Sequence, residues 1–360
     1  MQRLCDGPLQ LRNPVASVCS GAMKQRRLGR TGLVVSEICL GTMTFGNQAD
    51  EPTSHAILDR AWEAGVDFLD VAEIYPVPPA VSYAGRSEEI VGRWLADKPR
   101  DGVIVATKVA GPGSGWFVAP VRENHTALDR HHIARAVEAS LRRLGTDYID
   151  LYQTHWPDRG VPIDETLEAL SRLIEAGKIR YAGCSNETAY GLTKSLWASD
   201  LRGVARYETI QNNFSLLHRR FEDELAEVCR RESVSLLPYS PLAGGVLTGK
   251  YQDGAQPAGA RFTFYAGGSP RAQSMTRRFV NEGTLTSTAR YLRIAAAAGL
   301  AVGTLAVAWS LAHDFVGATI IGATTPAQLA DTLAAADVTL PADVRKACDE
   351  VSREIRYPMG

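Results

Sequence analysis

The sequence is sparing with cysteine, and its cysteines are not spaced for a metal site or a disulfide scaffold. Six cysteines are spread over 360 residues with no CxxC pair, whereas zinc modules and small disulfide-rich domains carry paired or dense cysteines. Cys39 and Cys184 fall inside apolar, strand-like runs, where a reduced and buried thiol is the usual state. We therefore expect a cytoplasmic protein whose thiols are reduced.

A long uninterrupted apolar run is also missing. Residues 1–22 contain no continuous hydrophobic segment of the kind that a secretory signal needs. We expect either that Met23 is the true start or that residues 1–22 form a disordered extension, followed by a single domain over 23–360. The most apolar stretch, 294–312, is rich in Ala and broken by Gly299 and Gly303. Two buried helices joined by a turn explain it better than a membrane span.

Charge of one sign is not in excess, because the formal net charge is -1 with 22% charged residues. This balance gives no reason to expect nucleic acid or an anionic membrane as a partner. The GxGxxG turn of a Rossmann dinucleotide site is absent as well. The Gly-rich stretch GPGSG at 111–115 lacks the Lys-Ser/Thr ending of a P-loop, so we interpret it as a flexible loop.

What the sequence does contain is a regular alternation of short β-branched runs with longer helical patterns. The eight runs are EICLG, FLDVA, VIVATK, IDLYQTH, IRYAGCS, TIQNNF, SLLPYS and ATIIGA. Eight βα units predict an α/β protein with a (β/α)8 TIM barrel. Before the first run, LGRTGLVVSEI predicts an N-terminal hairpin that turns near Thr31 and Gly32. Long connections after the second, third and seventh runs predict loops over the C-terminal face.

Four polar residues stand at or just beyond the ends of successive runs: Asp70, Tyr75, Lys108 and His155. Side chains at the C-terminal ends of neighbouring parallel strands converge on one pocket. There, Tyr75 is a candidate proton donor whose pKa, about 10 when free, is expected to be lowered by Lys108, with Asp70 holding the lysine charged. His155 would orient a carbonyl through a hydrogen bond or share in the proton relay. Singly, each has an ordinary structural explanation; together they favour a catalytic site.

An alternative function is a barrel enzyme of unrelated chemistry, such as a metal hydrolase that uses His125, His131 and His132 as ligands. Adjacent histidines at the start of a helix point in different directions, and no carboxylate pair completes a site at ligand spacing. We therefore expect no metal.

Several longer stretches match a known family in order along the chain. They include GRTGLVVSEICLGTMTFG, FLDVAEIYPVPP, YIDLYQTHWPDR, EAGKIRYAGCSNET, PYSPLAGGVLTGKY and IIGATTPAQL. With these motifs the chain resembles the aldo-keto reductases, and most closely the bacterial Tas-like branch related to potassium-channel β-subunits. The resemblance puts the family's proton-transfer tetrad on Asp70, Tyr75, Lys108 and His155.

The resemblance implies an NADPH-dependent oxidoreductase that reduces aldehydes and ketones, with Tyr75 as general acid. The alternative is an NADPH-binding, redox-sensing regulatory subunit with slow turnover. His155 favours the enzyme, because channel β-subunits generally carry Asn at that position.

The resemblance also implies a cofactor track, with NADPH preferred over NADH. Tyr239 would stack on the nicotinamide, while Lys250 and Arg261 would supply positive charge. Gly322 and Gln328 replace a Lys and an Arg of other branches, and Thr332 stands where Asn is usual. The implied cofactor residues are Gly41, Thr42, Met43, Asp70, Ser185, Asn186, Gln211, Tyr239, Ser240, Pro241, Leu242, Gly244, Gly245, Lys250, Arg261, Gly322, Thr324, Gln328 and Asp331.

The expected substrate wall is aromatic and apolar, which suits carbonyl compounds with hydrophobic bodies. It draws on Tyr75, Trp116 and Trp156, together with Met43 and Phe45. Core packing under a loop is an equal alternative for Trp116. The sequence does not name the carbonyl substrate, and it leaves the oligomeric state open.

Overall fold

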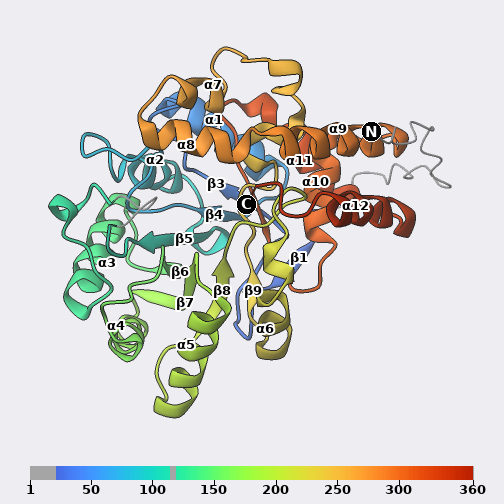
Figure 1. The fold of residues 1–360 in the computed structure, drawn as a ribbon. Coiled ribbons are helices and arrows are strands. Elements are labelled where there is room, and N and C mark those ends of the chain that lie inside the picture. The colour runs from blue at the N-terminus through green and yellow to red at the C-terminus, as the bar shows by residue number, and fades with distance from the viewer. Residues whose placement is uncertain (1–21, 114–118, 360) are drawn as a thin grey trace.

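The computed structural model describes residues 22–113 and 119–359 of the chain, and in this part strands and helices alternate (Figure 1). The strands are β1 Gln25–Arg27, β2 Val34–Ser36, β3 Ile38–Gly41, β4 Phe68–Asp70, β5 Ile104–Val109, β6 Ile149–Thr154, β7 Ile179–Ser185, β8 Tyr207–Gln211, β9 Ser235–Leu236 and β10 Thr319–Ile321. The α-helices are α1 Glu51–Glu63, α2 Arg86–Leu95, α3 Arg130–Leu144, α4 Ile163–Glu175, α5 Ala189–Arg202, α6 Leu225–Glu232, α7 Arg261–Ala266, α8 Pro270–Phe279, α9 Glu282–Ala297, α10 Val302–Leu311, α11 Ala330–Leu333 and α12 Ala342–Glu354.

Eight strands form one parallel sheet in the order β10-β3-β4-β5-β6-β7-β8-β9. Of these eight strands, the earliest and the latest in the sequence, β3 and β10, pair in register, with Ile320 opposite Cys39. The remaining gap closes at Leu236, whose N-H donates to the Phe315 carbonyl over 2.8 Å and whose carbonyl accepts from Gly317 N over 2.8 Å. The sheet is therefore a closed (β/α)8 barrel, as the eight runs predict.

One strand is shorter than its sequence pattern. The run SLLPYS contributes only Ser235–Leu236 to the sheet, because Pro238 has no N-H to continue the ladder. The Pro238 carbonyl still accepts from Ile320 N over 2.9 Å, so the barrel wall stays continuous beyond β9.

The predicted N-terminal hairpin is present as β1 and β2, with Arg27 opposite Val34. Its apolar side chains Leu28, Leu33 and Val35 are fully buried, in one cluster with residues from the inner wall of the barrel. Arg26 donates to the carbonyls of Leu311 (3.0 Å) and Val316 (3.1 Å). The hairpin thus seals the end of the barrel where the strands begin.

The apolar stretch 294–312 forms the end of α9 and all of α10, two helices joined by a turn, as expected. Every residue of α10 after Val302 is buried. In the described part of the chain no single helix is long and apolar enough to cross a membrane, and α9 and α10 reach that length only as a pair bent by 92°.

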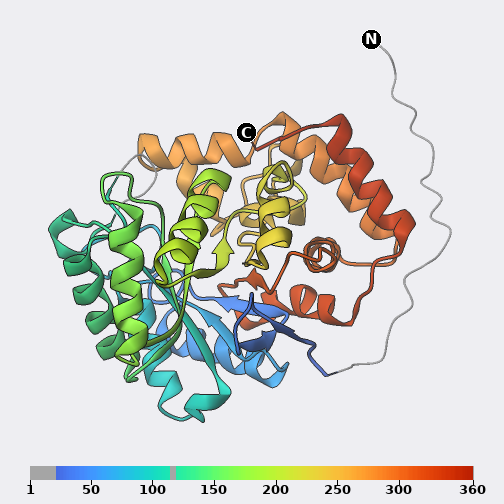
Figure 2. The same cartoon turned by 90° about the horizontal axis from the view of Figure 1, so that it is seen from below.

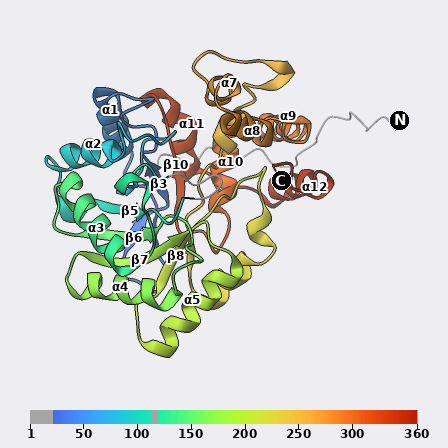
Figure 3. The same cartoon turned by 60° about the vertical axis from the view of Figure 1, so that its left-hand side comes forward.

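The connection from β9 to α9 is the longest over the barrel and carries α7 and α8. Figure 2 shows α8 and α9 (orange) and the C-terminus together at one end of the barrel. Figure 3 shows α7, α8, α9 and α12 grouped on one side of it. The end of the barrel where the strands finish is therefore covered by long connections on one side.

Candidate active site

Lys108 lies at the centre of a buried polar cluster at the ends of β4 and β5. Its ammonium donates to Asp70 Oδ2 over 2.7 Å and to the Val71 carbonyl over 2.7 Å, and lies 3.5 Å from the Tyr75 hydroxyl. Lys108 is fully buried and Asp70 is 2% exposed. The Lys108–Asp70 pair is therefore shielded from water. Because electrostatic interactions are stronger away from water, burial increases the influence of this pair on Tyr75.

Asp70 is held on its second oxygen as well. Gln211 Nε2 donates to Asp70 Oδ1 over 2.8 Å, and Gln153 Nε2 lies 3.4 Å from the same oxygen. Gln153 is not among the residues expected from the sequence. Residues two apart on a strand face the same side, so Gln153 on β6 points to the same side as His155. This spacing could have identified Gln153 from the sequence.

The pKa of Tyr75 is raised above 10, because burial outweighs the opposing effect of the nearby Lys108 ammonium. The expectation of a lowered pKa was therefore wrong: the desolvation of the phenolate is the larger effect in this closed pocket. A tyrosine with a raised pKa keeps its proton across the physiological range, and so remains available as a donor.

His155 follows β6 and faces Tyr75, with the two ring centroids 5.7 Å apart. Burial, with a smaller contribution from Lys108, lowers its pKa well below 6.5. Its Nδ1 is buried and has no hydrogen-bond partner among the described residues. A neutral imidazole with a free ring nitrogen can hydrogen-bond a carbonyl compound without carrying charge into the pocket.

A chain of hydrogen bonds continues from the tetrad along the ends of β7 and β8. Ser185 Oγ donates to the Gln211 carbonyl over 2.7 Å, and Asn186 Nδ2 donates to the His155 carbonyl over 2.9 Å. The Tyr239 hydroxyl donates to Asn186 Oδ1 over 2.8 Å. The structure therefore brings these three expected cofactor residues next to the tetrad and fixes the orientation of Tyr239.

Two cations flank a glycine turn just after Tyr239. Ser240, Gly244 and Gly245 all have positive φ, at 57°, 64° and 93°, within the expected stretch that also holds Pro241 and Leu242. A Cβ on Gly245 would lie 2.8 Å from Lys250 Nζ, and one on Gly244 would lie 3.6 Å from Arg261 Nη1. The pKa of Lys250 is lowered, by burial and then by Arg261. Two neighbouring cations beside a glycine turn form a cradle that suits a phosphate.

The other expected cofactor residues lie at the ends of β3 and β10. A Cβ on Gly41 would lie 2.8 Å from Ile320 Cγ2, so the position requires glycine. Thr42 is fully buried, its Oγ1 donating to the Asp70 carbonyl over 3.0 Å, and Met43 is partly buried against the Tyr75 cluster.

Beyond β10, Gln328 and Thr324 bond each other, with Thr324 N to Gln328 Oε1 at 2.9 Å. Gly322 and Asp331 are exposed. Thr332 is buried, and its hydroxyl donates inward to the Leu329 carbonyl over 3.1 Å. This position of the chain therefore turns its side chain away from solvent.

The expected substrate residues divide. Trp156 packs beside the site, its ring centroid 4.9 Å from that of His155 and its Nε1 donating to the Pro112 carbonyl over 2.8 Å. Phe45 is fully buried in the main core, so the expectation that it lines the pocket was wrong. Trp116 lies outside the described residues.

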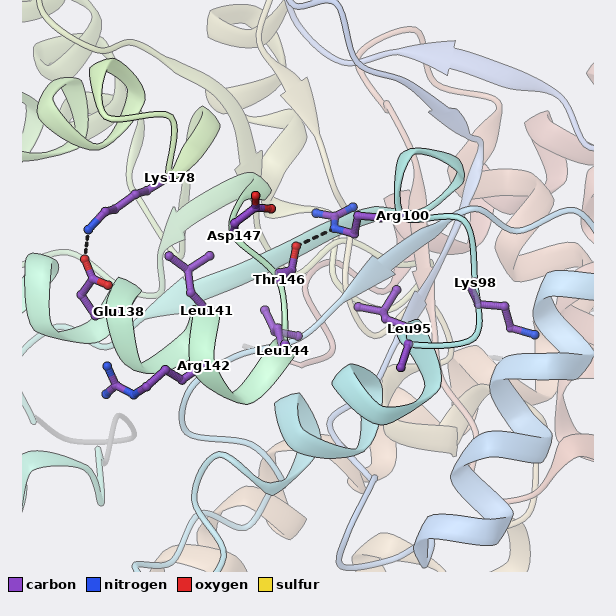
Figure 4. Close-up of a pocket in the computed structure, with 12 residues that line it drawn as sticks. Leu95, Lys98, Arg100, Glu138, Leu141, Arg142, Leu144, Thr146, Asp147 and Lys178 are labelled. Carbon is purple, nitrogen blue, oxygen red and sulfur yellow. Dashed lines mark hydrogen bonds and ion pairs between the residues drawn. The ribbon is translucent and has the colours of Figure 1, made fainter.

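A hollow of about 800 Å³ lies elsewhere, beside the C-terminal ends of α2 and α3 (Figure 4). It is lined by residues such as Arg100, Thr146 and Lys178 that precede β5, β6 and β7. This is the end opposite the tetrad, and in such barrels the chemistry takes place at the C-terminal face instead. Among residues 22–113 and 119–359, no group of three His, Cys, Asp or Glu is arranged to hold a metal ion.

Comparison with known proteins agrees with this geometry. The model of the aldo/keto reductase family matches residues 37–353. "Protein tas" of Escherichia coli is 42% identical over 354 residues, which cover 93% of this chain and 99% of that protein. A probable voltage-gated potassium channel subunit beta of Arabidopsis thaliana is 32% identical, covering 88% and 92%. Versiconal hemiacetal acetate reductase of Aspergillus parasiticus is 31% identical, covering 88% and 94%.

Proposed function

The chain belongs to the aldo/keto reductase family, and from this premise we propose that it is an NADPH-dependent reductase of aldehydes and ketones with Tyr75 as the general acid. The observation that carries the proposal is the buried Lys108 ammonium, 2.7 Å from Asp70 and 3.5 Å from the Tyr75 hydroxyl. An ion pair with a purely structural role would not need a tyrosine hydroxyl beside its ammonium. A tyrosine that donates a proton does need a cation nearby to stabilise its phenolate.

The division of labour among the four side chains follows from their charges. Bound NADPH would supply the hydride that adds to the carbonyl carbon. Tyr75 gives its proton to the carbonyl oxygen, and the Lys108 ammonium stabilises the phenolate that remains. Asp70 keeps Lys108 charged and in place, and neutral His155 orients the carbonyl by a hydrogen bond.

The cofactor fits the residues around the Gly244–Gly245 turn. The glycine backbone of that turn, with Lys250 and Arg261 beside it, suits phosphate groups, and a 2′-phosphate in particular gains from cations. Tyr239 would pack on the nicotinamide, held by its hydrogen bond to Asn186. These contacts support NADPH over NADH.

A small carbonyl compound with a hydrophobic body is the substrate class we propose, because Tyr75 and Trp156 belong to one largely apolar cluster. We also propose a cytoplasmic location for a single domain over 23–360. The four cysteines in the described part of the chain are free and buried, which suits a reducing compartment.

The proposed function is tested by mixing the purified protein with NADPH or NADH and a panel of aldehydes, ketones and quinones, and following the nicotinamide absorbance. We expect multiple-turnover oxidation of NADPH with an activated aromatic aldehyde, and slower oxidation of NADH. Oxidation of one equivalent followed by release over minutes would support the regulatory subunit instead. Absence of oxidation with every compound would contradict a reductase.

We predict that kcat/KM for reduction is nearly flat between about pH 6.5 and pH 9.5. The raised pKa of Tyr75 means that its proton is lost only above pH 10, and the lowered pKa of His155 means that the ring becomes charged only well below pH 6.5. A pH profile with 4-nitrobenzaldehyde checks this. A fall in kcat/KM as the pH rises from 7 to 9 would show that Tyr75 has a lowered pKa.

A further inference from the structure

Glu73, two residues before Tyr75, makes a buried, forked ion pair that the tetrad does not use. Arg122 Nη1 donates to Glu73 Oε2 over 2.6 Å, and Arg122 Nη2 donates to Oε1 over 2.8 Å. The Glu73 side chain is 1% exposed and that of Arg122 is 11% exposed. A forked, charge-assisted pair of this kind fixes both distance and orientation.

The pair joins the two ends of the loop that follows β5. Glu73 Oε1 also accepts from Ala110 N over 2.7 Å, at the start of that loop, while Arg122 lies near its end. The Thr126 hydroxyl donates to the Gly111 carbonyl over 2.6 Å and ties the two stems a second time. One carboxylate on the tyrosine-bearing connection therefore holds the loop at both sides.

The backbone at the Arg122 end does not favour this conformation by itself. Arg122, Glu123 and Asn124 have consecutive positive φ values of 50°, 54° and 64°. Side-chain-bearing residues avoid that region, and three in succession persist only where the surroundings enforce them. The ion pair between the Glu73 carboxylate and Arg122 is placed to hold this turn in its conformation.

The part of this loop next to Arg122 packs against the candidate proton donor. Ala119 is buried in the same apolar cluster as Tyr75 and Trp156, and Val121 packs against that cluster. Arg122 directly follows Val121, so the position of the guanidinium sets the position of this part of the wall.

We propose that Glu73 and Arg122 are positioning residues that latch the segment 119–128 against Tyr75 and Trp156, and that this segment thereby forms a fixed wall of the carbonyl pocket. The inference rests on the proposed reductase function. The latch leaves the cofactor cradle untouched, because Lys250 and Arg261 lie in the connection after β9. Loss of the latch therefore weakens binding of the carbonyl compound and spares NADPH.

The test uses the double variant Glu73→Gln/Arg122→Met, which leaves no unpaired buried charge and keeps an acceptor for Ala110 N. Its control is Glu88→Gln/Arg143→Met. That pair is also buried, with Arg143 Nε donating to Glu88 over 2.7 Å, but it joins α2 to α3, and its further hydrogen bonds go to Thr107 and Ser140 rather than to 119–128. Both variants lose one ion pair of similar burial.

For the latch variant we expect KM for 4-nitrobenzaldehyde to rise about tenfold or more, with kcat within about threefold of wild type. The Kd of NADPH, measured by fluorescence, stays within about twofold. Amide hydrogen exchange in peptides covering 119–128 accelerates about tenfold or more. The control variant shows wild-type KM and wild-type exchange in those peptides.

Unchanged exchange over 119–128 in the latch variant would overturn the latch, as would faster exchange with an unchanged KM. An equal rise of KM in the control variant would also overturn it, because the effect would then be one of general stability. A wild-type protein that reduces no carbonyl compound would refute the proposed function, whereas hydrogen exchange, which needs no turnover, would still decide whether Glu73 and Arg122 hold the loop.

Discussion

Replacing Tyr75 by Phe is expected to lower kcat for carbonyl reduction by about 1,000-fold, since general acid catalysis contributes about 100-fold to 10,000-fold. The substitution removes the proton that the raised pKa of Tyr75 retains, and leaves the buried Lys108–Asp70 pair in place. The ring stays in its apolar cluster, so NADPH affinity and the denaturation midpoint should change little. Steady-state kinetics, fluorescence titration with NADPH and urea unfolding measure the three quantities.

Tyr83→Phe is the matched control for this experiment. Tyr83 lies in the same connection between β4 and α2, and its hydroxyl donates to the Pro78 carbonyl over 2.5 Å, away from the tetrad. The Tyr83→Phe variant loses a hydroxyl and its hydrogen bond but keeps the hydroxyl of Tyr75, so its kcat should stay near that of wild type. If Tyr75→Phe reduced 4-nitrobenzaldehyde as fast as Tyr83→Phe, the assignment of Tyr75 as general acid would be wrong.

Replacing Lys108 by Met is expected to have the second large effect, and to act on both activity and stability. It removes the charge that stabilises the phenolate of Tyr75, so kcat should fall by at least about 100-fold. It also leaves Asp70 buried at 2% exposure without its cation, which costs about 3–5 kcal/mol when one partner of a buried pair is removed. Urea unfolding and steady-state kinetics measure the two losses separately.

The double variant Asp70→Asn/Lys108→Met separates the two roles of the pair. An asparagine carries no charge, so the buried-charge penalty disappears and the free energy of unfolding should recover most of its loss. The catalytic rate should not recover, because no ammonium faces Tyr75. Recovery of activity together with stability would mean that Lys108 acts only through the fold.

Much of this site was predictable from the sequence because strand geometry is local. The alternation of β-branched runs identifies the eight strands, and the C-terminal end of each run identifies Asp70, Lys108 and His155 as neighbours in a barrel. Tyr75 follows from its position five residues beyond Asp70, in the connection over the same mouth. No knowledge of side-chain packing is needed for these inferences.

The features that sequence reasoning missed depend on how distant segments meet. Gln153 was not expected, and neither was its sharing of one Asp70 oxygen with the expected residue Gln211. The ion pair of Arg122 with Glu73 joins positions 49 residues apart. The direction of the Tyr75 pKa shift depends on burial, which a charge pattern does not show. Phe45 was misassigned for the same reason, since its place after β3 does not say whether it faces the mouth or the core.

The pairing of β10 with β3 has a consequence for how the protein is made. These neighbours are separated by most of the chain, since Thr319 pairs with Ile38. During synthesis β3 emerges early and presents an open hydrogen-bonding edge until β10 follows, which is the condition in which strands associate with wrong partners. Contacts of such long sequence separation also slow folding. The parallel sheet therefore cannot close into a ring until residues 319–321 have been synthesised.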